Sequence, residues 1–185
     1  PHNRVLIGGT GYDDSVIEMG NDSRFSDCLL SQHLYPFWNT KLTTENQWLN
    51  ELKKRIGNHA KRTVITEFGT EMDKTNGIFD YSKINSGDHR IAFMRAIVTY
   101  IYNNNMGCTV WPGLRTKDTY SIYALKQNGN TISLVRNNES VIPLLRYAFR
   151  VPNDFNPTPS SDDGENIPKG VYRIINVNSG LYLDT

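Results

Sequence analysis

From Arg4 to about Phe149, short apolar runs alternate with longer segments whose apolar residues recur at helical spacing. This alternation forms four strand-then-helix units, a pattern typical of a parallel sheet covered by helices. Four units are half of the eight that close a (β/α)₈ barrel, whose usual length is about 250 residues. The sequence therefore predicts an α/β fold for residues 1–150, built as half of a TIM barrel.

The expected strands cover residues 5–9, 29–35, 63–67 and 107–111, and the longer expected helices cover 44–57, 87–104 and 139–149. Thr44 and Gln47 have the spacing of a capping box, and Gly57 is a suitable helix end. Pro143 moves the start of the last helix to a later residue. Asn128 and Gly129 predict the turn of a hairpin between the last strand and the last helix.

A complete, doubly wound open sheet is the competing architecture. Nucleotide-binding sheets of that kind carry a glycine-rich phosphate loop after a strand, and no such loop follows residues 5–9 or any later strand. This difference favours the barrel.

The composition changes after Arg150. Residues 151–168 are rich in Pro, Ser, Asn and Asp and have no apolar periodicity, which predicts a linker. Residues 169–185 then alternate as a strand, turn at Asn178–Gly180 and begin a second strand. A hairpin of this size is marginal alone, so a second domain is expected to begin here.

Charge and hydropathy exclude two classes of partner. The 20 basic and 19 acidic residues are spread along the chain and give a net charge of +1, which predicts no nucleic-acid partner and no anionic membrane surface. No apolar run approaches the roughly 18 to 20 residues that span a bilayer. Pro1 to Arg4 resemble neither a signal peptide nor an initiator methionine, so the chain is interpreted as a piece of a longer protein.

The chain has two cysteines, Cys28 and Cys108, and they lack the short spacing of a metal site. We expect both to be small buried residues. A disulfide between them remains an alternative that sequence alone does not settle.

Polar and aromatic residues occur where the expected strands end, and this is where parallel barrels carry their reactive groups. Glu67 ends the third strand, His33 and Tyr35 share one face of the second, and Trp111 ends the fourth. Glu67, His33 and Tyr35 each have an ordinary structural interpretation: a solvated or ion-paired charge, a core histidine and a packing tyrosine. Together they predict one site.

These motifs resemble clan A glycoside hydrolases, most closely glycoside hydrolase family 5. The resemblance covers residues 4 to about 149 and implies the C-terminal half of the barrel, with its strands six, seven and eight ending in His33-Leu34-Tyr35, Thr66-Glu67-Phe68-Gly69 and Trp111. It implies that Glu67 is the nucleophile of a retaining endo-β-glycanase, that Tyr35 hydrogen-bonds its carboxylate, that His33 lies near the glycosidic site and that Trp111 stacks on a sugar. Another clan A family would keep Glu67 and change the roles of His33 and Tyr35.

The same resemblance places the acid/base glutamate upstream of Pro1, so the chain as given is predicted to be inactive. Glu71, Asp73 and Asp118 lie on loops and are not expected to replace it. No metal or organic cofactor is implied, and the expected partner is a polysaccharide; cellulose, mannan, xylan and β-1,6-glucan all fit.

Residues 169–185 resemble the first hairpin of a ricin-type β-trefoil, as in carbohydrate-binding module family 13. A carbohydrate module on a linker raises the effective concentration of a barrel on a polymer, and it implies a secreted protein. The alternatives are a non-catalytic carbohydrate-binding barrel and, less favoured, a structural half-barrel.

Overall fold

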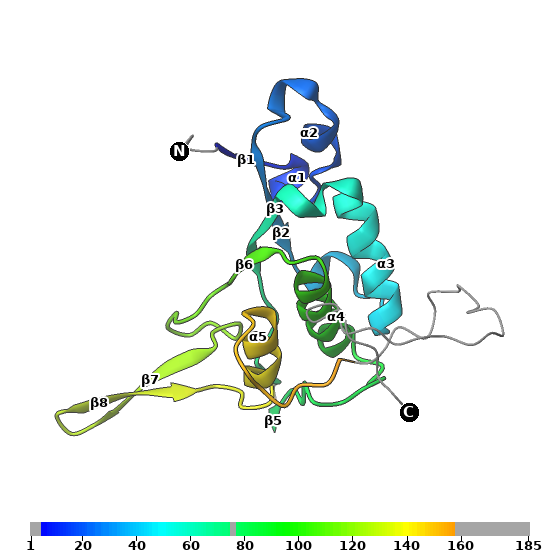
Figure 1. Ribbon diagram of the computed structural model, residues 1–185. Coiled ribbons are helices and arrows are strands. Elements are labelled where there is room, and N and C mark those ends of the chain that lie inside the picture. The colour runs from blue at the N-terminus through cyan, green and yellow to red at the C-terminus, as the bar shows by residue number, and fades with distance from the viewer. Residues whose placement is uncertain (1–4, 75–76, 158–185) are drawn as a thin grey trace, which may run out of the picture.

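The computed structural model describes residues 5–74 and 77–157, and its centre is a four-stranded parallel sheet (Figure 1). The strands lie in the order β1 (Leu6–Gly8), β2 (Leu29–Leu34), β3 (Thr63–Phe68) and β6 (Gly107–Val110). Two antiparallel pairs lie outside it: β4 (Asp73–Lys74) with β5 (Gly77–Ile78), and β7 (Tyr123–Asn128) with β8 (Thr131–Arg136). The predicted mixed α/β fold with a parallel sheet is confirmed, as is the predicted hairpin.

The helices are α1 (Thr10–Asp13), α2 (Ile17–Asn21), α3 (Glu45–Ile56), α4 (His89–Asn103) and α5 (Ile142–Ala148), with 3₁₀ turns η1 (Ser23–Phe25), η2 (Pro36–Asn39) and η3 (Gly57–Arg62). The capping box of α3 is present, because the Thr44 hydroxyl accepts from the Gln47 backbone and the Gln47 side chain accepts from the Thr44 backbone. α3 ends at Gly57, whose φ of 57° suits glycine. Pro143 lies in the first turn of α5.

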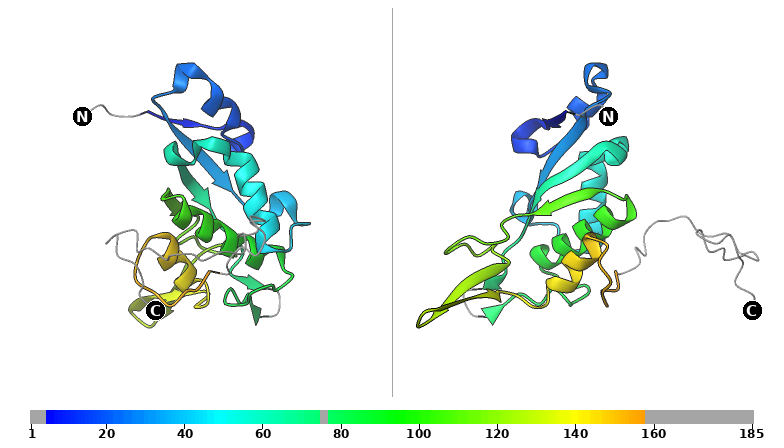
Figure 2. Two further views of the ribbon diagram at one scale, coloured as in Figure 1. Left: turned by 45° about the vertical axis from the view of Figure 1, so that its right-hand side comes forward. Right: turned by 60° about the vertical axis from the view of Figure 1, so that its left-hand side comes forward.

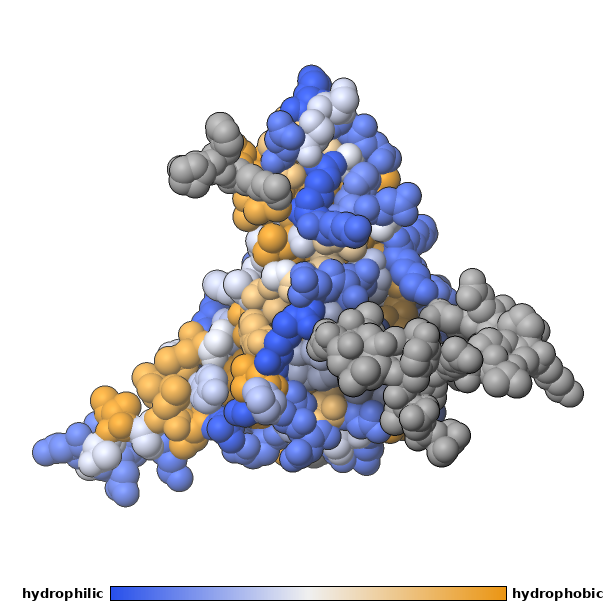
Figure 3. All heavy atoms as spheres, in the orientation of Figure 1, coloured by the Kyte–Doolittle hydropathy of each residue, from blue (hydrophilic) through white to orange (hydrophobic). Residues whose placement is uncertain are grey.

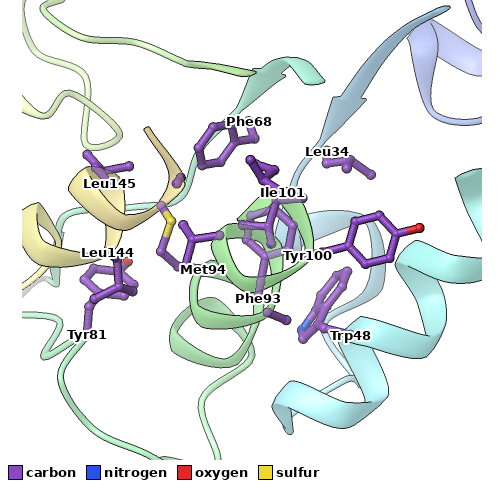
Figure 4. Packing of buried hydrophobic residues seen from close by; sticks show 14 of the residues in the cluster. Leu34, Trp48, Phe68, Tyr81, Phe93, Met94, Tyr100, Ile101, Leu144 and Leu145 are labelled. Atoms are coloured by element: carbon purple, nitrogen blue, oxygen red, sulfur yellow. The ribbon is translucent and has the colours of Figure 1, made fainter. Parts of the chain in front are cut away.

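Three helices cover one face of the sheet. α4 packs against α3 on one side and α5 on the other, and all three lie on the same side of the strands (Figures 1 and 2). The Trp48 and Phe93 rings of α3 and α4 meet edge to face at 5.0 Å. Leu34, Ile65 and Phe68 of the sheet join these helices in one apolar core (Figure 4). α4 is buried over most of its length because it has neighbours on both sides and the sheet beneath it.

The strand order bears on the choice between architectures. Each strand pairs with the next strand of the sheet along the chain, whereas a doubly wound sheet reverses its order part-way. Right-handed crossovers in one direction place successive helices on one face, as α3 and α4 are placed. The four described strands do not close on themselves; β1 and β6 are the two edges. A parallel, singly wound sheet is therefore established, and a full barrel is not.

The face of the sheet opposite the helices carries polar residues. The Ser31 hydroxyl lies 2.6 Å from the Thr66 hydroxyl, and the Thr109 hydroxyl donates to the Thr66 carbonyl. The register shifts between Gln32 and His33, so that Thr66 is skipped and His33 pairs with Glu67. This irregularity decides which side chains meet at the end of the sheet.

The β7–β8 hairpin and residues 151–157 lie outside the central sheet. The β7–β8 hairpin projects from the body and exposes Leu125, Ile132 and Leu134, visible as an apolar patch in Figure 3. Residues 151–157, part of the predicted linker, have no helix or strand, and Phe155 packs against Tyr147 at 5.0 Å. The rest of that linker and the trefoil-like segment at 169–185 lie outside the described residues. Among the described residues, no helix is both long and apolar enough to cross a membrane.

Both cysteines are free thiols. Cys28 immediately precedes β2 and Cys108 lies on β6, with β3 between them. Because neighbouring strands are about 4.8 Å apart, this places the two residues beyond the roughly 7 Å between Cα atoms that a disulfide tolerates. The disulfide alternative is therefore wrong for this fold.

Candidate functional site

Three of the predicted site residues meet at the carboxyl end of the sheet. Glu67 is the penultimate residue of β3, His33 lies opposite it on β2, and Tyr35 follows β2 directly. His33 and Tyr35 are two residues apart on an extended segment, so they project to the same side, as the sequence predicted. Both side chains reach the Glu67 carboxylate.

The Tyr35 hydroxyl donates a short hydrogen bond to Oε1 of Glu67. Tyr35 is buried, and burial together with this bond raises its pKa well above its usual range. The phenol therefore stays protonated and remains a donor. The Glu67 side chain is 28% exposed, so its carboxylate is held in place and still reachable from solvent.

His33 lies between two carboxylates. Its Nε2 is 3.9 Å from Oε2 of Glu67 and 3.6 Å from Oδ2 of Asp13, both in the range of an ion pair and beyond that of a hydrogen bond. Asp13 is the last residue of α1, the single turn after β1, and was not singled out in the sequence, where it is one of two consecutive aspartates. The one sequence feature that could have pointed to Asp13 is the Gly8-Gly9 pair at the end of the preceding strand.

Trp111 follows β6 and approaches β3 through its backbone. Its N–H donates to the Phe68 carbonyl at 2.8 Å. Gly69 makes this approach possible, because a Cβ there would lie 2.1 Å from the Trp111 carbonyl oxygen. Trp111 is 47% exposed, so part of this residue is accessible to solvent.

Aromatic rings surround Tyr35, and the sequence reasoning missed them. Phe37 stacks on Tyr35 at 5.2 Å, while Trp38 and Tyr120 meet it edge to face at 5.7 and 6.0 Å. Phe37 and Trp38 are in the turn η2, directly after Tyr35, and Tyr120 comes from the loop after Trp111. Burial raises the pKa of Tyr120 to about 12. These rings hold the Tyr35 phenol in position.

A pocket of about 420 Å³ lies on the same loop as Tyr120. Residues 114–119 line it, together with Asp73, Ala124, Leu125 and Asn137. Asp118 connects the pocket to the aromatic cluster, because its carboxylate accepts from the Tyr120 backbone N–H at 2.8 Å. The pocket combines aliphatic walls with polar groups, a lining suited to a polar organic ligand.

The loop carboxylates have structural partners. Glu71 forms an ion pair with Arg90, and Asp118 lies 3.4 Å from Arg115. Neither contacts Glu67. Across residues 5–74 and 77–157, no group of three or more His, Cys, Asp or Glu side chains is arranged to hold a metal ion.

Chemically, the arrangement is an oriented, accessible carboxylate with one strong donor on Oε1 and an imidazole near Oε2. Such a group can act as a nucleophile or as a general base. Comparison with known proteins adds no relative: no family model matches the chain, and neither a curated protein nor a solved structure matches it.

Proposed function

We propose that this chain contributes the nucleophile half of a retaining glycoside hydrolase acting on a β-linked polysaccharide, with Glu67 as nucleophile. The hydrogen bond from Tyr35 to Oε1 of Glu67, at the mouth of a parallel sheet, carries the proposal. A retaining enzyme needs an ionised carboxylate aimed at the anomeric carbon, and a donor on one oxygen stabilises that ionised form. The other oxygen, Oε2, is then the attacking atom.

In the first step, Oε2 of Glu67 forms a bond to the anomeric carbon as the bond to the leaving oxygen breaks. Water then attacks the anomeric carbon from the face that the leaving group vacated, opposite the ester, and the carboxylate of Glu67 departs, so that two inversions retain the configuration. A second carboxyl group about 5 to 5.5 Å away protonates the leaving oxygen and later activates the water. We assign that acid/base to a further part of the barrel, beyond the described edge strands.

The rest of the proposal follows the same resemblance to glycoside hydrolase family 5. Trp111 offers an open indole on which a sugar ring could stack, and His33 lies within reach of the glycosidic oxygen. Residues 151–168 link the barrel to the trefoil-like segment, which begins a carbohydrate-binding module of a secreted enzyme. No cofactor takes part.

Labelling with an activated sugar tests the nucleophile without the missing acid. A dinitrophenyl 2-deoxy-2-fluoro-β-glycoside releases dinitrophenolate without protonation, so its glycosyl group should form a stable ester with Glu67. The 185-residue chain, and the longest natural polypeptide containing it, are incubated with gluco-, manno- and xylo-configured reagents. Intact mass and peptide mapping should locate one added glycosyl group on the peptide that holds Glu67.

The matched variants are Glu67→Gln and Glu18→Gln. Glu67→Gln should remove labelling, whereas Glu18→Gln, an exposed position on α2, should label like the wild type. Esterification of another residue would remove Glu67 from this role. Oligosaccharide binding with no labelling in either polypeptide would support instead the non-catalytic carbohydrate-binding barrel.

A further inference from the structure

The single turn α1, which follows β1, has an uncommon backbone. Gly11, Tyr12 and Asp13 have φ values of 61°, 63° and 65°, so three successive residues lie in the left-handed region. Side chains other than glycine adopt it at a cost, and consecutive residues rarely do. Tyr12 is 94% exposed and gains no packing in return. Backbone hydrogen bonds between Thr10 and Ser15 close the turn, and Asp13 adds side-chain contacts to the sheet.

The Asp13 carboxylate is fixed against the polar face of the sheet. Its Oδ2 accepts a hydrogen bond from the Ser31 hydroxyl at 2.9 Å and lies 3.6 Å from Nε2 of His33. Ser31 in turn lies 2.6 Å from the Thr66 hydroxyl, next to Glu67. Gly8 leaves the necessary room, because a Cβ there would be 2.5 Å from Oδ1 of Asp13. The backbone of α1, the space at Gly8 and the Ser31 hydroxyl together position the Asp13 carboxylate.

We propose that Asp13 is a positioning residue that holds the His33 imidazole at a distance from Glu67; this rests on the proposed function of Glu67. The two carboxylates face the same ring nitrogen at 3.6 and 3.9 Å, so an N–H at this position is attracted to both. Asp13 shares the attraction of that N–H and keeps the ring from closing on Oε2. Oε2 is thereby left free to attack while Tyr35 holds Oε1.

A double-mutant cycle on the labelling rate tests whether Asp13 acts through His33. Asp13→Ala should slow esterification of Glu67 about tenfold, since a small misplacement near the reacting atoms is costly. In the His33→Ala background, Asp13→Ala should have no further effect. Asp22→Ala, which removes a partly buried carboxylate that is paired with Arg24 outside the site, should label like the wild type. Equal slowing by Asp13→Ala in both backgrounds, or no slowing in either, would overturn the proposal.

A second measurement needs no substrate and separates this proposal from that of Glu67. The His33 ring gives one Cε1–Hε1 signal in a ¹H–¹³C spectrum, assigned by its loss in His33→Ala. Asp13→Ala and Ser31→Ala should shift or broaden it, while Asp13→Asn, which keeps an oxygen for the Ser31 hydroxyl, should have a smaller effect. An unchanged signal in folded Asp13→Ala refutes positioning even if Glu67 is labelled. A shifted signal without labelling at Glu67 means that the proposed function alone is wrong.

Discussion

The Tyr35 hydroxyl and Oε1 of Glu67 are joined by a hydrogen bond, although 32 residues separate them in the chain. Parallel pairing of β2 with β3 brings both residues to the carboxyl end of the sheet, and the register shift places His33 opposite Glu67. One oxygen of the carboxylate is therefore occupied by a donor, and the other faces an imidazole. This division of the two oxygens makes Glu67 more than a solvated charge at a strand end.

Replacing Tyr35 with Phe should slow the chemistry at Glu67 with little effect on binding. The substitution keeps the ring packed against Phe37 and Tyr120 and removes only the donor. A hydrogen bond to a charged group is worth about 1.5–3 kcal/mol, so the labelling rate should fall about 10- to 100-fold. The maximal labelling rate should fall, whereas the reagent concentration that gives half of this rate should stay the same.

Phe37→Leu is the control for Tyr35→Phe, because it disturbs the stacking at 5.2 Å and leaves the hydroxyl in place. It should slow labelling much less. If both variants slow it equally, the packing of Tyr35 matters and its hydroxyl does not.

A methyl group at Gly69 should destabilise the protein and displace Trp111. The added Cβ would lie 2.1 Å from the Trp111 carbonyl oxygen, which is backbone and cannot rotate away. We expect Gly69→Ala to lower the free energy of unfolding by about 1–3 kcal/mol, the usual cost of overpacking. Urea unfolding and Trp fluorescence measure the two effects. Gly113→Ala, where no atom lies within 4 Å of the added Cβ, should be close to neutral.

Local signals explain how much of the fold could be predicted. Thr44 and Gln47 define the start of α3 through contacts within a single turn, and Gly57 ends it through its own backbone preference. Pro143 fixes the start of α5 in the same way. The strands were found because apolar runs between helical segments are visible without knowledge of their partners.

The site was only partly predictable because its geometry depends on long-range pairing. Period-two spacing placed His33 and Tyr35 on one side, but the register shift that skips Thr66 has no sequence signal. Asp13 reaches the site through left-handed backbone at non-glycine residues, which composition does not reveal. Tyr120 approaches Tyr35 from a loop 85 positions further along the chain, and such contacts follow from the tertiary fold alone.

Both cysteines should remain reduced under oxidising conditions. A reductant should leave the melting temperature unchanged, since no disulfide joins Cys28 and Cys108. Burial raises the pKa of Cys108 to about 11, so little thiolate is present near neutral pH and the thiol should react slowly with Ellman's reagent in the folded protein. Cys108→Ser should remove this slow reaction with Ellman's reagent. A melting temperature that falls with reductant would contradict the geometry.

High pH should destabilise the protein through its buried tyrosines. Burial raises the pKa of Tyr120 to about 12, and it raises those of Tyr35 and Tyr81 well above their usual 10.0. Below the unfolded pKa both states are protonated and stability is unaffected. Above it the unfolded state ionises first, so the free energy of unfolding falls by about 1.4 kcal/mol per pH unit for each tyrosine that stays protonated when folded.

The measurement is urea unfolding between about pH 9 and about pH 11.5, where the loss sets in as the pH passes the unfolded pKa. Tyr120→Phe removes one of the phenols whose pKa is raised and should make the slope shallower by the contribution of that one tyrosine, while the others, such as Tyr100, keep theirs. Thr119→Ser, on the same loop and without a titratable group, should keep the wild-type slope. If Tyr120→Phe also keeps it, the Tyr120 phenol is not held protonated by its burial against Tyr35, and the aromatic cluster around the site is looser than its ring contacts indicate.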